Sequence, residues 1–390
     1  MYNWSRVDEM LRLATHAPGS PEDYRLSKDL VAPGMVLLVS KAGAPIYHKA
    51  FGSRSLEPEI TALDKDMTFD VASLTKALIT TTLVMKQVQS GQLSLDKKLT
   101  HIFQTFGTLG KEKISIKHLL SHSSGYAAHR AFFQELDKAN KGSRAGILGS
   151  KGAVDYVYNE LFRSELDYPT GSKSVYSDLG FMLLAKVLGV VSGSSLEKLA
   201  RREIFAPLEL ASSGFVDLSA LKHHGVEAVQ EVIVPTLAAC DWRDKLLCGE
   251  VHDDNAWAMG GVCGHAGLFS NASDINKMAS ELVLASKGKS AFLSQEVVSE
   301  FWRKPDDVPG SSWALGWDTP DDEGSSAGKY FSKHSVGHLA YTGCSLWIDI
   351  PKEVTVVLLT NRIHPDDKNK AIKEFRPVIH DLVMDTLGYS

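Results

Sequence analysis

Two stretches with the pattern of a β-hairpin lie near opposite ends of this 390-residue chain. Residues 35–52 read MVLLVSKAGAPIYHKAFG, with a turn at Lys41, Ala42 and Gly43. Residues 345–361 read SLWIDIPKEVTVVLLTN, with a turn over residues 350–353. Apolar runs separated by a short turn are typical of paired strands. The two patterns therefore predict one antiparallel sheet built from both ends of the chain and flanked by helices.

The middle of the chain has helical periodicity instead. Apolar residues recur every three or four positions in four segments, residues 116–122, 151–163, 178–193 and 195–205. The expected fold class is therefore α+β, with an inserted and mostly helical domain. We expect residues 1–100 and 260–390 to form the sheet domain, residues 101–259 to form the helical domain, and a site to lie in the groove between them.

Two further helices and two loops complete the expected organisation. Val7, Met10, Leu11 and Leu13 predict a short amphipathic helix near the start, and a helix is also expected over residues 368–387. Residues 139–152 and 303–329 are rich in Gly, Ser, Pro and charge, which is typical of exposed loops.

Composition limits the possible partners and location. The net charge of −5 gives no indication of a basic face for nucleic acid, so no nucleic-acid partner is expected. No run approaches the roughly 18 apolar residues of a membrane span. The first twenty residues lack the apolar core of a secretory signal, so a cytoplasmic location is expected, or a periplasmic one if a signal has been removed. The sequence does not indicate an oligomeric state.

Residues 69–85, FDVASLTKALITTTLVM, place a lysine inside an apolar run. A helix is expected from near Ser73 to about Gln89, capped by Asp70 or Ser73. Ser73 and Lys76 would then lie on one face, with Cβ atoms about 5–6 Å apart. A lysine whose charged end simply extends into solvent is the alternative, and Ser-x-x-Lys alone is a common chance match.

Two downstream elements make that match specific. Tyr176-Ser177-Asp178 follows about 100 residues later, and His338-Leu339-Ala340 precedes the last hairpin. Together with Ser73 and Lys76, they resemble the three motifs of the serine β-lactamase-like family, which includes class C β-lactamases, D,D-peptidases and esterases. The resemblance covers about residues 30–365. It implies the β-lactamase and penicillin-binding-protein fold, with a small molecule or short peptide as substrate.

The resemblance also implies roles for these residues. Ser73 would be the nucleophile, and either Lys76 or Tyr176 would act as the base that activates it. Tyr176 would then protonate the leaving group. The backbone N–H groups of Ser73 and Tyr341 would form the oxyanion hole. No metal and no cofactor is implied.

The sequence departs from the family pattern at its substrate-binding positions. Asp178 stands where lactamases usually have Asn, and a carboxylate can accept but not donate a hydrogen bond. It would favour the charged form of Lys76. His338 and Ala340 replace a Lys-Thr-Gly or His-Thr-Gly motif that often helps to bind a substrate carboxylate, so His338 remains as a possible hydrogen-bond donor. For Trp313 and Trp317, core packing and substrate contact are equally open.

These observations predict a serine hydrolase that forms an acyl-enzyme on Ser73. Because of the departures, we expect an esterase or a D-amino-acid peptidase rather than an efficient β-lactamase. The pattern does not distinguish an ester, an amide and a β-lactam. The alternative is a non-catalytic, penicillin-binding-like binder or regulator on the same scaffold.

Overall fold

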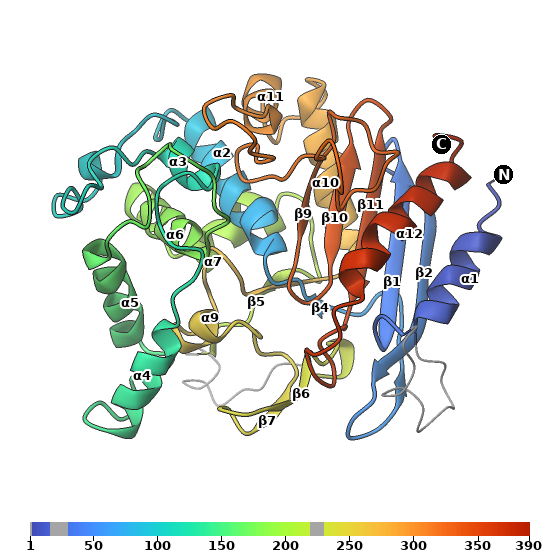
Figure 1. Ribbon diagram of the computed structural model, residues 1–390, viewed down its shortest axis with the longest axis horizontal. Coiled ribbons are helices and arrows are strands. Elements are labelled where there is room, and N and C mark those ends of the chain that lie inside the picture. The colour runs from blue at the N-terminus through green and yellow to red at the C-terminus, as the bar shows by residue number, and fades with distance from the viewer. Residues whose placement is uncertain (1, 16–29, 219–229) are drawn as a thin grey trace.

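A six-stranded antiparallel sheet forms the right-hand part of the computed structural model as Figure 1 shows it. The structure describes residues 2–15, 30–218 and 230–390. Three strands from the start of the chain form one half of the sheet and three from its end form the other half, which confirms the predicted antiparallel sheet and the α+β class. In sheet order the strands are β3 (Thr61–Ala62), β2 (Ala44–Ser55), β1 (Gly34–Lys41), β11 (Val354–Thr360), β10 (Ser345–Asp349) and β9 (Val336–Leu339).

Helices cover both faces of this sheet and fill the rest of the molecule. The longer helices are α1 (Ser5–Ala14), α2 (Thr82–Gln89), α4 (Phe132–Lys141), α5 (Lys151–Arg163), α6 (Asp178–Ser192), α10 (Ala272–Ser286), α11 (Gln295–Trp302) and α12 (Ile372–Thr386). The shorter ones are α3 (Ile116–Leu120), α7 (Leu196–Ala200), α9 (Asp254–Ala258), the 3₁₀ turns η2 (Leu99–His101) and η4 (Gln230–Val232), and the π-helical η1 (Lys76–Thr81) and η3 (Arg201–Phe205).

The period-2 alternation of β1 divides the core into two layers. Met35 and Leu37 point toward the layer that also holds Val7 of α1 and Ile379 of α12. Val36 points to the opposite layer, with α10 and the helical region of the chain. Helices α1 and α12 accordingly lie side by side against one face of the sheet (Figure 1). A strand buried on both faces reads as the continuous apolar run seen in the sequence.

A smaller sheet joins the middle of the chain to the segments on either side of it. Its order is β4 (Phe69–Asp70), β8 (Leu268–Ser270) and β5 (Gly214–Phe215), and a separate hairpin pairs β6 (Leu237–Cys240) with β7 (Lys245–Leu247). Because β5 pairs with β8, hydrogen bonds cross the domain boundary expected near residue 260. The division into two domains stays a prediction.

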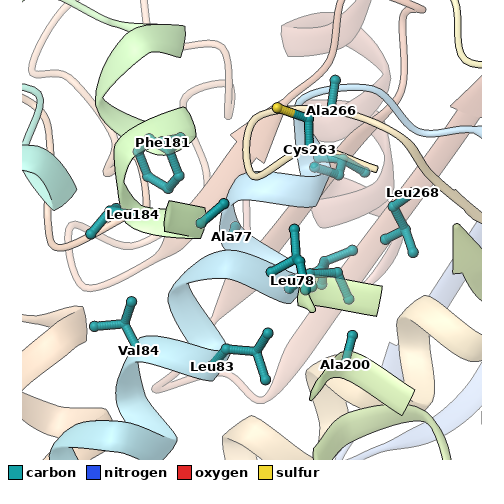
Figure 2. Packing of buried hydrophobic residues seen from close by; sticks show 14 of the residues in the cluster. Ala77, Leu78, Leu83, Val84, Phe181, Leu184, Ala200, Cys263, Ala266 and Leu268 are labelled. Atoms are coloured by element: carbon teal, nitrogen blue, oxygen red, sulfur yellow. The ribbon is translucent and has the colours of Figure 1, made fainter. Parts of the chain in front are cut away.

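The apolar helix that carries Lys76 lies at the centre of the larger core. Ala77 and Leu78 of η1 are buried, and Phe181 and Leu184 of α6 lie beside this helix (Figure 2). Figure 2 also places Cys263 on the neighbouring segment. This packing fixes the first turn of the helix between α6 and the segment before β8.

Most sequence-predicted elements are confirmed, with three differences. Leu13 is 68% exposed, because α1 buries Val7, Leu11 and Ala14 instead. Residues 139–141 belong to the end of α4 rather than to a loop. The predicted exposed loop over residues 303–329 contains a buried centre, because its residues 314–317 pack against the core.

Among the described residues, no single helix combines the length and apolarity needed to cross a membrane. One pair bent by 73°, α6 with residues Leu196–Phe205, passes that test only when both helices are taken together.

Candidate active site

Ser73 lies in a tight turn just before the helix. Ala72 has a φ of 42°, which is unusual for a residue with a side chain. The Asp70 carboxylate holds this turn by accepting hydrogen bonds from the N–H of Ala72 at 2.9 Å and of His252 at 2.7 Å. The helix begins at Leu74, close to the expected start at Ser73, and has π-helical geometry from Lys76 onward. Asp70 stabilises the preceding turn, so its expected role as the helix cap is wrong.

Lys76 is completely buried, and its ammonium group has three acceptors. Its Nζ lies 2.9 Å from Ser73 Oγ, 2.8 Å from Asp178 Oδ1 and 2.9 Å from the carbonyl oxygen of His265. An ammonium has three N–H donors, so all of them are used. The alternative in which Lys76 simply extends into solvent is wrong.

Asp178 sets the charge of this lysine. Burial alone lowers the pKa of an ammonium, but the Asp178 carboxylate and Tyr176 together outweigh burial and hold the pKa of Lys76 above its usual range. Burial likewise opposes ionisation of Asp178, yet the Lys76 ammonium and His129 hold the pKa of Asp178 well below its usual range. The expectation that Asp178 favours charged Lys76 is confirmed. In the resting site, Lys76 therefore donates a proton toward Ser73 Oγ and has no free lone pair.

Tyr176 lies over the same ammonium. Lys76 Nζ is 4.9 Å from the centre of its ring, within cation–π range. Burial raises the pKa of Tyr176 and the Lys76 charge only partly opposes this, so the phenol is neutral at pH 7. Hydrogen bonds with the side chains of Lys76 and Ser73 also lower the pKa of Tyr176, by less than burial raises it. The three side chains predicted to converge are therefore brought together in one place.

A second buried ion pair, between His265 and Asp253, lies next to the pair of Lys76 and Asp178. His265 Nε2 lies 2.9 Å from Asp253 Oδ1. Burial lowers the pKa of a histidine, but Asp253 outweighs it and the pKa of His265 lies well above its usual range. The pKa of Asp253 correspondingly falls to about 2, because His265 more than offsets the effect of burial.

The three acidic and histidine side chains here are close enough to suggest a metal site. The ligand atoms of Asp178, Asp253 and His265 all lie within 4.8 Å of one another. Their charges are already compensated, however, because Lys76 pairs with Asp178 and His265 pairs with Asp253. A divalent cation would have to compete with the Lys76 ammonium, so these residues fit a metal poorly.

The His265 carbonyl is positioned by a close contact between backbones at Gly264. A Cβ atom built on Gly264 would lie 2.2 Å from the carbonyl oxygen of Phe181 in α6. We expect Gly264→Ala to lower the free energy of unfolding by about 1–3 kcal/mol, as overpacking does, and to slow turnover by moving this carbonyl. Urea denaturation measures the first effect. Gly214→Ala is the control, because its Cβ would meet nothing within 4 Å; equal stability of the two variants would contradict this account of the contact.

A pocket of about 630 Å³ opens in front of Ser73. Tyr176, Asp178, His338 and Ala340 line it, as the sequence predicted for a substrate site. The backbone N–H groups of Ser73 and Tyr341 donate no hydrogen bond within the described part of the chain. Ser73 and Tyr341 both line the pocket, so these two N–H groups are available as the predicted oxyanion hole.

His338 differs from its expected role as a donor. Its Nδ1 lies 2.8 Å from the Leu339 carbonyl oxygen, so Nδ1 carries the hydrogen and Nε2 has a lone pair. Burial lowers the pKa of His338 to about 3, so the ring is neutral at pH 7. Nε2 is buried and has no partner among the described residues. The prediction of a donor is therefore wrong, because His338 offers an acceptor.

Ala340 and the edge strand β9 leave little backbone for a substrate. The Ala340 N–H donates to the Cys344 carbonyl at 2.8 Å, and its own carbonyl accepts from Arg376 at 2.8 Å. Asp318 pairs with Gly337 on the outer edge of β9. An extended substrate has only the end of this strand beyond His338 to pair with.

Trp313 and Asp318 border the pocket; the sequence left the role of Trp313 open and did not mark Asp318 as a site residue. Trp313 lies against Tyr176, with ring centres 5.4 Å apart, and lines the pocket, whereas Trp317 is fully buried in the core. Trp313 is therefore in position for substrate contact, whereas Trp317 serves core packing. Asp318 also lines the pocket and carried no sequence signal, because it lies in a segment that reads as a polar loop.

The fold and the arrangement at Ser73 define the class of β-lactamase and penicillin-binding-protein-like proteins. The chain belongs to the Beta-lactamase family, whose model matches residues 25–376. This match confirms the predicted family across most of the chain.

Relatives in that family have several activities in their names. The chain is 29% identical over 368 residues to a Bacillus subtilis (strain 168) protein named N-acetylmuramyl-L-alanine amidase, covering 88% of this chain and 80% of that protein. It is 28% identical over 362 residues to an Escherichia coli (strain K12) protein named "Putative D-alanyl-D-alanine carboxypeptidase", covering 86% and 80%. The family and these relatives are hydrolases.

Solved structures share the fold at lower identity. A mutant of simvastatin synthase from Aspergillus terreus has a TM-score of 0.69 at 17% identity, covering 98% of this chain and 94% of the other. EstCE1, described as a hydrolase with promiscuous acyltransferase activity, has a TM-score of 0.68 at 18% identity, covering 95% and 97%. At this identity the likeness establishes the fold alone.

Proposed function

We propose that this protein is a serine hydrolase that forms an acyl-enzyme on Ser73 and acts on an ester or an amide. The observation that carries the proposal is the 2.9 Å contact between Ser73 Oγ and the buried Lys76 Nζ, at the wall of a 630 Å³ pocket. A serine hydroxyl needs a neighbouring group that removes its proton, and this lysine is in place to relay it.

Asp178 holds the relayed proton only transiently, because Lys76 and His129 keep its pKa low. Lys76 has no free lone pair, so it must release a proton before it can receive one. Asp178 Oδ1, 2.8 Å from Nζ, takes a proton from Lys76 while Nζ takes the proton of Ser73. The net result is a neutral Asp178, a charged Lys76 and an alkoxide that attacks the acyl carbon. The negative charge passes to the carbonyl oxygen, where the N–H groups of Ser73 and Tyr341 stabilise it.

Tyr176 completes the acylation step. Its neutral phenol donates a proton to the leaving group as the tetrahedral intermediate collapses, and the bond between the acyl carbon and the leaving group breaks. The phenolate then regains a proton through Lys76 from Asp178. The proton that began on Ser73 is therefore balanced by the one that leaves with the product. Water repeats the sequence in reverse to release the acyl group.

The names of the relatives support transfer of an acyl group without fixing the substrate. Amidase, carboxypeptidase and esterase chemistry all pass through a tetrahedral intermediate at an acyl carbon. Esterase, D-amino-acid peptidase and β-lactamase activity are therefore the candidate activities. A binder or regulator without turnover is the alternative.

Covalent labelling tests the proposal. The protein is incubated separately with a fluorophosphonate and with a fluorescent penicillin, and its intact mass is then measured. We expect one adduct per chain with the fluorophosphonate, and no adduct in Ser73→Ala. Ser299→Ala, an exposed serine on α11, is the matched control and should label like the unaltered protein. No adduct with either probe would favour the non-catalytic binder, and an adduct that persists in Ser73→Ala would place the nucleophile elsewhere.

A further inference from the structure

No lysine or arginine lines the pocket within the described part of the chain, although Lys76 Nζ contacts Ser73 at its wall and Asp178 raises the pKa of the lining residue His129. In contrast, four aspartates line it, Asp178, Asp253, Asp254 and Asp318. A substrate carboxylate would therefore enter a pocket with four carboxylates in its lining. Recognition of a carboxylate usually uses arginine or lysine, and that chemistry is missing here.

Three of the four aspartates have their charge compensated inside the protein. Lys76 pairs with Asp178, His265 pairs with Asp253, and Arg243 lies 2.5 Å from Asp254. Asp318 has no ion-pair partner among the described residues, and Lys304 affects it only at a distance. Asp318 is thus the one uncompensated carboxylate of the wall.

Asp318 is held in a fixed position. Its Oδ1 accepts hydrogen bonds from the Ser312 hydroxyl at 2.7 Å and from the Thr319 N–H at 3.0 Å. Its backbone pairs with both Trp313 and Gly337. The other carboxylate oxygen, Oδ2, accepts no hydrogen bond within the described residues. Burial raises the pKa of Asp318 to about 6, which still leaves it mostly ionised at pH 7.

Aromatic and acceptor groups surround the same end of the pocket. The ring of Trp313 lies 5.6 Å from that of His338 and 5.4 Å from that of Tyr176. The buried Nε2 of His338 is an acceptor that lacks a donor. An unpaired buried acceptor costs free energy unless a ligand satisfies it. A carboxylate, an aromatic face and an unpaired acceptor together match the chemistry of an ammonium that carries N–H donors.

This end of the pocket lies on the side of the leaving group. Tyr176 protonates the leaving group in the proposed mechanism, and its ring is in contact with that of Trp313. His252 and Phe133 also line the pocket, and their ring contacts are with Tyr341 and Trp242 instead of with this cluster of rings.

Resting on the proposed function, we infer that the substrate carries an ammonium group on its leaving-group side, bound by Asp318, Trp313 and His338. A leaving group with a free carboxylate, such as a C-terminal amino acid, is disfavoured. This separates the protein from a carboxypeptidase that releases such a residue.

Three esters that share one acyl group test the inference. Phenylacetyl esters of 4-(aminomethyl)phenol, 4-ethylphenol and 4-(carboxymethyl)phenol have leaving groups of similar size that are cationic, neutral and anionic at pH 7.5. Release of each phenol gives kcat/KM. We expect the cationic ester to exceed the neutral one by about tenfold, the order of a partly buried cation–π and charge interaction, and the anionic ester to be the slowest. An anionic ester that is the fastest of the three would overturn the inference.

Asp318→Asn tests the assignment to this residue. The amide keeps an oxygen for Ser312 and Thr319, so the fold is expected to persist, and its circular dichroism spectrum checks this. We expect the cationic-to-neutral ratio to fall to near one in Asp318→Asn and to be retained in Asp321→Asn, which removes the same charge from an exposed position of the same loop. A ratio that survives in Asp318→Asn overturns the assignment.

The two proposals fail in different ways. If no ester is hydrolysed and Ser73 takes no fluorophosphonate, the proposed function fails. If Ser73 is labelled and the neutral ester is hydrolysed, but the cationic ester shows no advantage, only the inference about the ammonium fails.

Discussion

Lys76→Met is expected to reduce kcat/KM by about 10³-fold or more and to destabilise the protein. Methionine fills a similar volume but removes the group that carries the proton from Ser73, and positioned proton-transfer groups account for about 10²–10⁴-fold in rate. The change also removes the ion-pair partner of the Asp178 carboxylate, whose side chain is 18% exposed, and leaves the histidines His129 and His265 as its cationic neighbours. Breaking a buried ion pair costs about 3–5 kcal/mol, and partial exposure favours the lower end of that range.

Two comparisons separate these effects. Lys76→Met combined with Asp178→Asn should recover part of the lost stability, because no unpaired carboxylate remains, while turnover stays low. Lys111→Met removes another fully buried lysine, which donates to the Ser164 carbonyl outside the pocket, and should change kcat/KM less than threefold. Ester hydrolysis and urea denaturation give both quantities. A Lys76→Met protein that keeps a tenth of its activity would rule out Lys76 as the proton relay.

Tyr176→Phe is expected to reduce turnover by about 10²–10⁴-fold, because it removes the phenol that protonates the leaving group. The size of the loss should depend on the leaving group. A p-nitrophenolate can leave as an anion, whereas an alkoxide must be protonated as it leaves. We therefore expect a much larger loss with an alkyl ester than with a p-nitrophenyl ester of the same acid, measured as kcat/KM.

The control removes a phenol elsewhere. Tyr156 of α5 bonds to Glu135 and does not line the pocket, so Tyr156→Phe should leave both rates within threefold. Equal losses with the two esters in Tyr176→Phe would mean that the phenol acts before the leaving group departs. A loss below threefold with both would remove Tyr176 from the mechanism.

The local sequence pattern was sufficient to predict most of the helices and strands. The turns at Ala42 and Gly43 and at residues 350–353 join strands as the sequence indicated, because β1 and β11 are continuous apolar runs bounded by turn residues. The periodicity over residues 151–163 matches α5 in full. Order along the sequence did not reveal which strands are neighbours, since β1 pairs with β11 across almost the whole chain.

The candidate site, too, could be predicted only in part from the sequence. Ser73, Lys76, Tyr176 and Asp178 were recognised from motif spacing, and they converge. The His265 carbonyl on Lys76 was not foreseen, because any residue can supply a backbone carbonyl and the sequence does not mark it. The acceptor on His338 was also missed, since the hydrogen on its ring is placed by a bond to the Leu339 carbonyl that only folding creates.

The sequence alone determined which chemical groups are available: a hydroxyl, an ammonium, a phenol and a carboxylate at fixed spacings, on a chain with the strand and helix periods of its family. The tertiary structure alone decided their charge, their pairing and their direction. A pKa depends on burial and on neighbours brought from distant segments, and the charge of a pocket depends on which carboxylates are already paired. Asp318 shows the difference, because it is an ordinary loop aspartate in the sequence and the one aspartate on the described pocket wall without an ion-pair partner.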